Sequence, residues 1–324
     1  MLIVAISNSF VNGFVSPQIA MWYTFHVMSS TLLRFDKFIS IDWSGAKGPY
    51  LKNLKVAVCL PGEVAPKLVQ PPGFHTWRRD DLVDWIIKEA KYQRVLVGVD
   101  FAFAYPYCDK SAYFPGSYES PNSVRALWQT IDTACQSEPS LYGGPFYKDG
   151  TSPFSQYLCY QTYKGQRFNN HRLRNSEKVC ELMGTRPTCT FKCVGPDQVG
   201  SGTAAGMRAL HHIAQNHNES ISIWPFDDLR ERISTFVEIF PRLFFILAKR
   251  DPRKWQDLSI VNAVLTHFKS ELLARHAIMS SEDEVDAIVS AAALRNLSLN
   301  QDTWFPGKLD EMTRQYEGWI FGCT

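Results

Sequence analysis

The chain has 324 residues, of which 45% are hydrophobic and 20% are charged, a composition that suits one large globular domain or two ordinary ones. Its formal net charge of +2 excludes a global field that would drive the protein onto nucleic acid or an anionic membrane, so a polyanion must be held by a local patch. The eight cysteines lack the paired spacing of a zinc site and several lie in apolar runs, which predicts buried thiols, a reducing compartment and a cytoplasmic location.

The first 33 residues contain no Lys, Arg, Asp or Glu. The basic start of a signal peptide is therefore missing, and Asn, Ser, Pro and Gly interrupt the apolar residues too often for a spanning helix. We interpret residues 1–35 as an extension outside the fold, with a weak membrane anchor as the alternative, and we expect no membrane partner. The remaining residues, 36–324, are predicted to form one domain.

An α/β pattern begins after the extension. Residues 79–92 place Leu82, Ile86 and Ala90 at helical spacing. Apolar runs of strand character surround this helix, at residues 37–43, 54–60, 73–77 and 94–104. The last of these runs is almost continuously apolar, which is typical of a strand covered on both faces. The order of strands and helix predicts a mixed sheet flanked by helices.

Proline and glycine break this pattern between residues 105 and 185, where only residues 123–136 have helical spacing. The segment is too rich in aromatic residues for a free linker, so we interpret it as a long insertion after the fourth strand, over one end of the sheet. Regular elements then return: strands are predicted at residues 188–195, 220–227 and 234–245, and helices at 200–216, 258–276 and 281–299.

Acidic residues interrupt the apolar runs at several strand ends. Asp42 ends the first strand, Asp100 lies late in the strand after the first helix, and Glu238 lies within the run 234–245. The first turn of the last helix adds Asp283, Glu284 and Asp286. Convergent carboxylates repel one another and are costly to desolvate, and a divalent cation offsets both effects. Taken singly, Asp42 would be a turn residue and the helix acids would be ordinary N-terminal charges.

These acids lie in segments that are similar to a known family. The chain resembles the uncharacterised proteins described as predicted nucleases with an RNase H fold, in the segments ISIDWSGA, VGVDFAFAYP, GPDQVGSGTAAGMRAL, IWPFD, VEIFPRLFF, EDEVDAIVSAAAL and EGWIFG. The resemblance implies an RNase H-like mixed sheet flanked by helices, with Asp42, Asp100 and Asp286 as catalytic residues. It also implies Mg²⁺ or Mn²⁺ ligands among Asp42, Asp100, Glu238, Asp283 and Asp286, with Glu284 as an alternative to Asp283.

A metal-dependent phosphodiester hydrolase, that is a nuclease, is the main hypothesis from these observations. Residues 163–178 carry basic side chains with interleaved aromatics, which predicts a nucleic-acid groove or else a solvated surface with structural salt bridges. The expected substrate-binding residues are Ser44, Lys164, Arg167, Arg172 and Arg174.

Two other functions remain open at this point. Glycine turns at residues 42–48 and 197–206 could hold phosphate, as in an actin-like or sugar-kinase-like ATP-dependent phosphotransferase. The chain could also use the RNase H fold as a non-catalytic binding protein. Convergence of the Asp42, Asp100 and Asp286 carboxylates would favour the hydrolase.

Overall fold

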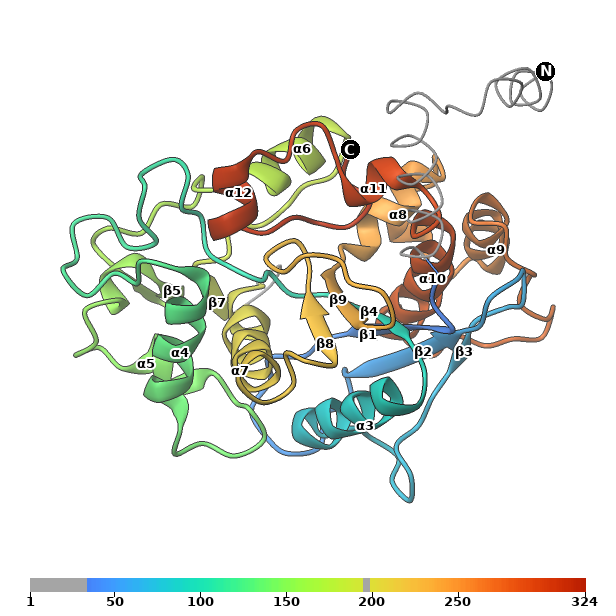
Figure 1. Cartoon of the computed structure of the whole chain (residues 1–324), viewed down its shortest axis with the longest axis horizontal. Coiled ribbons are helices and arrows are strands. Elements are labelled where there is room, and N and C mark those ends of the chain that lie inside the picture. The colour runs from blue at the N-terminus through green and yellow to red at the C-terminus, as the bar shows by residue number, and fades with distance from the viewer. Residues whose placement is uncertain (1–33, 195–198) are drawn as a thin grey trace, which may run out of the picture. The chain divides into compact units, whose positions relative to one another are not determined.

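A six-stranded mixed sheet lies at the centre of the chain (Figure 1). The computed structural model describes residues 34–194 and 199–324, and Phe35–Thr324 form one compact unit. Across the sheet, the strands follow the order β3 (Lys67–Leu68), β2 (Lys55–Cys59), β1 (Lys37–Asp42), β4 (Val95–Val99), β9 (Ser234–Glu238) and β8 (Ile221–Ile223). β3, β2 and β1 pair antiparallel, whereas β1, β4, β9 and β8 are parallel.

Helices cover both faces of this sheet (Figure 1). α3 (Arg79–Tyr92) and α7 (Gly200–Asn216) lie on one face, and α10 (Glu282–Leu297) crosses the other, over β1 and β2. α8 (Pro241–Leu247) and α9 (Leu258–His267) pack beside α10, and a 3-10 turn, η2 (Pro252–Lys254), lies between them in the sequence. The chain ends with α11 (Gln301–Trp304) and α12 (Glu311–Tyr316).

Side chains alternate along the strands, and this alternation decides which residues meet α10. Ile39 and Ile41 join the hydrophobic core on the α3 face, whereas the Ser40 hydroxyl donates a hydrogen bond to the Ala287 carbonyl of α10. In β4, a Cβ added at Gly98 would lie 2.7 Å from the Leu294 side chain, so α10 approaches this strand closely. The even-numbered residues of both strands therefore face α10.

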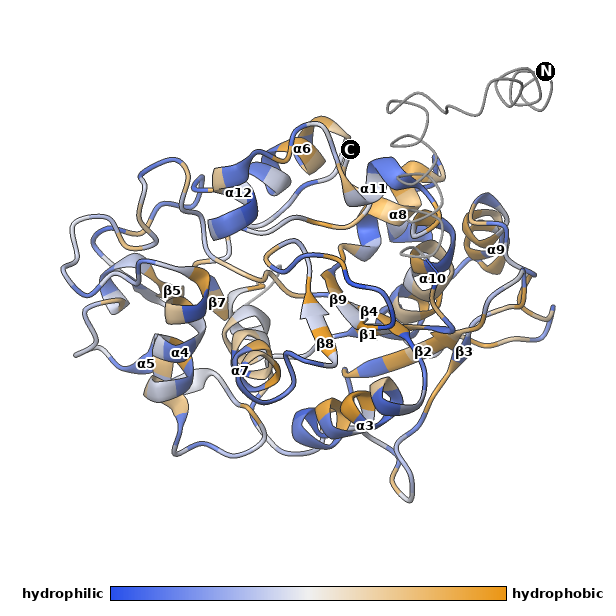
Figure 2. Ribbon diagram, viewed as in Figure 1, coloured by the Kyte–Doolittle hydropathy of each residue, from blue (hydrophilic) through white to orange (hydrophobic). Residues whose placement is uncertain are grey.

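Hydropathy follows the same division into layers. α3 places hydrophobic residues toward the sheet and hydrophilic residues away from it (Figure 2), and its buried positions include Leu82, Val83 and Ile86. The predicted alanine-rich face of the last helix is buried, with Ala287, Ala291 and its neighbours almost without exposure. Small side chains on this helix permit the close approach to the sheet.

The insertion forms a second layer of structure after β4. It contains α4 (Val124–Cys135), α5 (Gly144–Lys148), η1 (Ser155–Tyr157), α6 (Asn175–Leu182) and a three-stranded sheet of β6 (Tyr163–Lys164), β5 (Cys159–Tyr160) and β7 (Lys192–Val194). Aromatic rings pack in its core; Tyr105, for example, stacks on Phe191 with ring centroids 4.6 Å apart. The predicted strand at 188–195 thus belongs to this small sheet, and the insertion extends beyond the predicted residue 185.

The predicted strands 94–104 and 220–227 end earlier, at Val99 and Ile223, and three other predicted elements differ more from the structure. The third strand is β3, not residues 73–77, of which only Trp77 makes an isolated bridge, to Leu51. The predicted strand 234–245 ends at Glu238, because Pro241 lacks an N–H and begins α8. The predicted helix 258–276 ends at His267, before a positive φ of 52° at Lys269.

Two further observations concern the whole described chain. All eight cysteines are free thiols, and Cys108 and Cys159 are the two that are partly exposed. Among the described residues, no helix combines the length and apolar character needed to cross a membrane. The predicted extension lies almost entirely outside the described residues.

Candidate carboxylate site

Two carboxylates leave adjacent parallel strands at the same level. Ile41 of β1 is in register with Val99 of β4, and the Asp100 N–H donates to the Ile41 carbonyl at 3.0 Å. Asp42 and Asp100 are the next residues of the two strands. Because alternate side chains share a face, both carboxylates lie on the α10 side of the sheet.

The first turns of α10 bring the third carboxylate to the same place. Ser281 caps the helix by accepting a hydrogen bond from the Glu284 N–H at 3.3 Å. The Ser40 contact with Ala287 then holds the next turn against β1, two residues before Asp42. Asp286 precedes Ala287 and therefore lies beside the end of β1.

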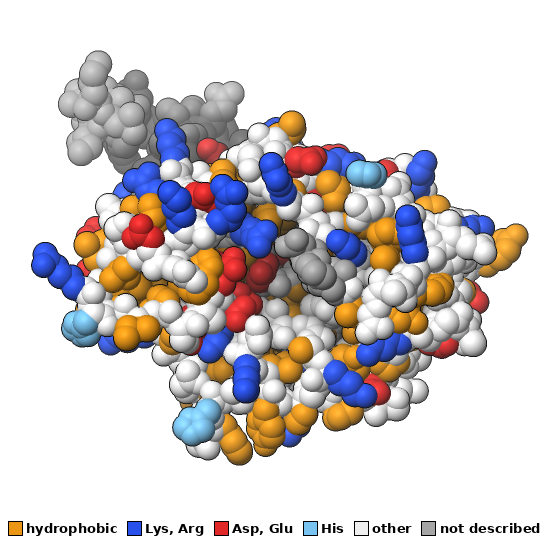
Figure 3. All heavy atoms as spheres, turned by 180° about the vertical axis from the view of Figure 1, so that it is seen from behind, with side chains coloured by type: hydrophobic (Ala, Val, Ile, Leu, Met, Phe, Trp, Pro, Cys, Tyr) orange, Lys and Arg blue, Asp and Glu red, His pale blue; other side chains and the backbone are white. Residues whose placement is uncertain are grey.

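These three carboxylates are half-buried and have no hydrogen-bond or ion-pair partner within residues 34–194 and 199–324. On the surface, acidic side chains gather in a hollow that basic side chains border (Figure 3). The absence of neutralising partners sets these three acids apart from Glu238 and Glu284, which are paired with Arg174 and Lys55.

Burial and mutual repulsion both disfavour the charged forms of these acids. The pKa of Asp42 is raised well above its ordinary value, first by burial and then by Asp100 and Asp286. Burial and the nearby Glu238 raise the pKa of Asp100 to about 7, against the opposing effect of Arg242. The pKa of Asp286 is also raised, by burial and by Asp100. Together these groups form a site that favours protons or another cation.

The metal-free protein should therefore lose stability as the pH rises. In the unfolded chain Asp100 releases its proton near pH 4, whereas the folded protein retains it until about pH 7. Between these values the folded state holds more protons, so the free energy of unfolding falls with pH, by up to about 1.4 kcal/mol per pH unit for each proton. Urea unfolding in EDTA at pH 5 to 8 should show this slope, and Asp100→Asn should reduce it. An equal slope in both proteins would contradict the prediction.

A buried arginine holds the turn that follows Asp42. The Arg79 side chain, at the start of α3, donates to the Ser44 carbonyl at 2.7 Å, to the Ser140 carbonyl at 2.8 Å and to the Ala46 carbonyl. Ser44 itself is buried, and its hydroxyl accepts a long 3.4 Å hydrogen bond from the Ala46 N–H. The Ser44 side chain thus belongs to the turn, beside the carboxylates, and Arg79 positions that turn.

Glu238, an expected metal ligand, lines the same small pocket as Asp100 but is paired with an arginine. Val99, the residue before Asp100, is in register with Glu238. Its carboxylate accepts from Arg174 Nη1 at 2.8 Å and from the Phe103 N–H at 2.9 Å. We therefore correct its assignment: Glu238 is neutralised by the buried Arg174 and is no ligand of the carboxylate cluster.

Asp283 and Glu284, the other candidate acids of α10, differ in whether a cation neutralises them. Lys55 of β2 is in register with Asp42 of β1, and its ammonium group donates a hydrogen bond to the Glu284 carboxylate at 2.8 Å. Burial would raise the pKa of Glu284, but hydrogen bonds from Lys55 and Ser280 bring it below its usual range. Asp283 is half-buried without such a hydrogen bond from Lys55, and burial raises its pKa. Of these two acids, Asp283 is the better candidate to assist the cluster.

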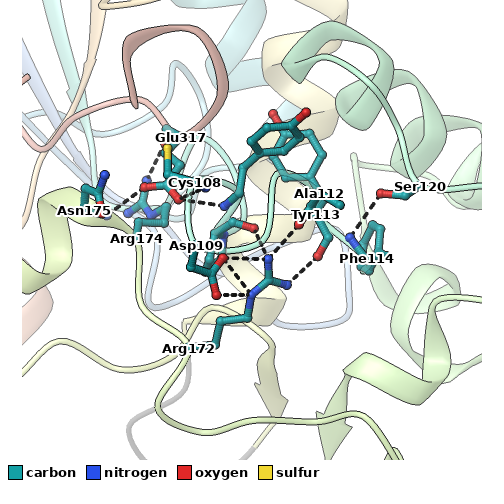
Figure 4. Close-up of polar contacts among 12 residues, drawn as sticks. Cys108, Asp109, Ala112, Tyr113, Phe114, Ser120, Arg172, Arg174, Asn175 and Glu317 are labelled. Carbon is teal, nitrogen blue, oxygen red and sulfur yellow. Dashed lines mark hydrogen bonds and ion pairs between the residues drawn. The ribbon is translucent and has the colours of Figure 1, made fainter. Parts of the chain in front are cut away.

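The basic stretch 163–178 is only partly available to a ligand. Arg172 is buried and donates to Asp109 at 3.0 Å and to the Tyr113 carbonyl at 2.6 Å (Figure 4). Arg174 is 1% exposed and binds Glu177, Glu238 and the Glu317 carbonyl. These two arginines are structural, which corrects their predicted role in substrate binding.

Lys164 and Arg167, the other two predicted substrate-binding residues of this stretch, are exposed. Arg167 donates from Nη1 to the Pro115 carbonyl and to the Tyr157 hydroxyl, both at 2.9 Å, so one of its nitrogens is engaged by the protein. Lys164 lies over the Phe168 ring at 5.8 Å. Arg172 and Arg174 are therefore fixed within the insertion, whereas Lys164, Arg167, His171 and Lys178 are exposed.

The cluster offers the right type of donor for a hard cation but does not yet surround one. Within the described residues, no three Asp, Glu, His or Cys side chains stand close enough together to hold a metal ion as they are placed. Carboxylate oxygens are the ligands that Mg²⁺ and Mn²⁺ prefer, so the type of donor fits these ions.

Two basic residues of the site were not recognised in the sequence. The charge of Arg242 opposes the rise in the pKa of Asp100 and Asp286, and Lys55 donates a hydrogen bond to Glu284. Arg242 was hidden because the run 234–245 was interpreted as one strand. Recognition of Pro241 as the first residue of a helix would have placed Arg242 at a helix start beside the strand end.

Comparison of the chain with protein-family models, with curated proteins and with solved structures found no match. The function must therefore be argued from the site itself.

Proposed function

We propose that this protein is a metal-dependent phosphodiester hydrolase with an RNase H-like fold. One observation carries the proposal: Asp42, Asp100 and Asp286 come from two adjacent strands and the last long helix, share one face of the sheet, and lack partners among the described residues. The neighbouring acids Glu238 and Glu284 form ion pairs with Arg174 and Lys55, respectively. The mixed sheet flanked by helices is compatible with the RNase H-like fold that the resemblance implies.

Each carboxylate has a distinct part in this proposal. Asp42 and Asp100 leave adjacent strands and would hold the ions between them, while Asp286 closes the site from α10. Bound Mg²⁺ or Mn²⁺ would supply activation of water and neutralisation of charge on the reacting phosphate. Arg242, whose charge acts on both Asp100 and Asp286, would contact a substrate phosphate at the edge of the cluster.

Calorimetric titration with Mn²⁺ tests the proposal directly. The wild-type chain at pH 7.5 should bind the ion and release protons, because the carboxylates that hold protons must lose them. Asp42→Asn should lose at least one site. Asp84→Asn, which removes an exposed acid on α3, is the matched control and should titrate as the wild type does. Equal binding by the wild type and Asp42→Asn would overturn the catalytic proposal.

The phosphotransferase alternative has one observation in its favour. The glycine turn after Asp42 packs against the start of α7: a Cβ added at Gly45 would lie 2.3 Å from the Gly202 backbone nitrogen. Both glycine segments thus meet beside the carboxylates, although Asp197 of the second segment lies outside the described residues. Thermal unfolding with and without Mg²⁺ and ATP separates the two functions, since a phosphotransferase should be stabilised by ATP beyond the effect of Mg²⁺ alone.

A further inference from the structure

A second feature lies next to the carboxylate cluster: a groove of about 590 Å³. Three arginines line it, from three separate segments: Arg186 after α6, Arg242 in the first turn of α8, and Arg253 in η2. Glu282 and Asp251 also line the groove. The volume is that of a ligand site, and the convergence of three guanidinium groups indicates an anionic ligand.

The charge of this surface remains positive after its ion pairs are counted. Asp251 pairs with Arg253 at 2.8 Å, and Glu282 approaches Arg242 at 3.9 Å. Arg186 is exposed and has no ion pair within the described residues. The loop that contains Arg253 adds further exposed cations on both sides of it, namely Lys249, Arg250 and Lys254. This is the local basic patch that a chain with a net charge of only +2 needs in order to hold a polyanion.

Two residues that line the groove, Glu282 and Arg242, act electrostatically on Asp286 of the carboxylate cluster. Glu282 on its wall opens α10, one helical turn before Asp286, and residues four apart share a helix face. Arg242, which also lines the groove, follows β9, the neighbour of the strand that leads to Asp100. A ligand in the groove would therefore extend to the acids. Figure 3 shows basic side chains along the border of the acidic hollow.

We propose that this groove binds the phosphodiester backbone of a nucleic-acid strand and guides it to the carboxylates, an inference that rests on the proposed hydrolase function. Arginine binds phosphate through paired N–H donors, which suits a surface built from three of them. Among residues 34–194 and 199–324, no aromatic side chain lines the groove, so recognition depends on phosphates and is independent of sequence. This surface replaces residues 163–178 as the nucleic-acid site.

Fluorescence anisotropy on the full chain in EDTA tests the proposal without cleavage. The probes are labelled single-stranded DNA and RNA of about 20 nucleotides, longer than the usual site of one domain, with an equal duplex and a labelled mononucleotide for comparison. Arg186→Gln/Arg253→Gln should weaken strand binding about tenfold and lower the slope of log Kd against log salt by about 1.4, since each lost phosphate contact contributes about 0.7. Lys164→Gln/Arg167→Gln is the matched control and should change binding less than about twofold.

Each outcome decides the proposal. Loss of binding in the Lys164/Arg167 control instead of the groove variant would return the site to residues 163–178 and overturn it. Binding of the mononucleotide alone, or of no probe, would also overturn it. Failure of the hydrolase function is seen separately, as absent Mn²⁺ binding with groove-dependent strand binding intact. Cleavage that is unaffected by the groove variant would reject the groove and leave the hydrolase function standing.

Discussion

Asp100→Asn is expected to lower Mn²⁺-dependent cleavage of a labelled single strand at least about 100-fold. Removal of an outer-shell partner of a metal ligand typically costs 10–100-fold, so loss of a direct carboxylate ligand should cost more. The same substitution removes a repelling charge from a half-buried cluster that lacks partners among the described residues. The variant should therefore be at least as stable as the wild type without metal, and its inactivity could not be attributed to unfolding.

Initial rates of cleavage, with urea unfolding curves for each protein, provide this test. Asp84→Asn should retain wild-type rates, because Asp84 is exposed on α3. Asp283→Asn shows whether the second candidate acid of α10 assists. A rate for Asp100→Asn within about threefold of the wild type would remove Asp100 from the catalytic set, given the size of ligand effects. A fully stable variant with unchanged Mn²⁺ binding would do the same.

The second large effect concerns stability rather than catalysis. Arg174→Met should lower the free energy of unfolding by about 3–5 kcal/mol, the usual consequence of leaving a buried charge without its partner. The Arg174 side chain is 1% exposed and binds both Glu177 and Glu238, which are almost equally buried. Removal of the guanidinium leaves two carboxylates in the interior between the insertion and the sheet. Urea unfolding at pH 7 measures the loss.

Two further variants separate burial from charge in this experiment. Lys178→Met removes an exposed cation from the same helix and should change the free energy of unfolding by less than about 0.5 kcal/mol. The combination Arg174→Met/Glu177→Gln/Glu238→Gln should recover part of the loss, because neutral amides are far less costly to bury than unpaired charges. Destabilisation below about 1 kcal/mol in Arg174→Met would contradict the structural role that we assign to the pair.

Glu238 and Asp100 show that local sequence patterns cannot distinguish a neutralised acid from an unpaired one. Both acids interrupt apolar runs, and nothing in the neighbouring residues distinguishes them. Their opposite fates come from a long-range contact, because Arg174 neutralises Glu238 whereas Asp100 has no such partner among the described residues. Such a contact cannot be obtained from a single run of residues.

The role of the arginines in residues 163–178 also could not be predicted from their local sequence. A basic run with interleaved aromatics is equally typical of a binding surface and of a segment that is held by internal ion pairs. Arg172 reaches Asp109, and Arg174 reaches Glu238, 64 residues away in the chain. The guanidinium groups of Arg172 and Arg174 are therefore engaged in ion pairs within the protein and are not available to a ligand. The groove cations come from three segments that only folding brings together.

Local residue patterns alone were enough to place the first strand, the strand before Asp100, the five longest helices and the acids that end or open these elements. They sufficed because hydrophobic periodicity, helix capping and turn chemistry act over a few neighbouring residues. Long-range pairing settled the remaining questions: which acids share a face, which are neutralised, and where cations gather. Strand register, the path of the insertion and the packing of α10 across β1 join residues more than 200 positions apart, such as Ser40 and Ala287, and no local pattern specifies such a contact.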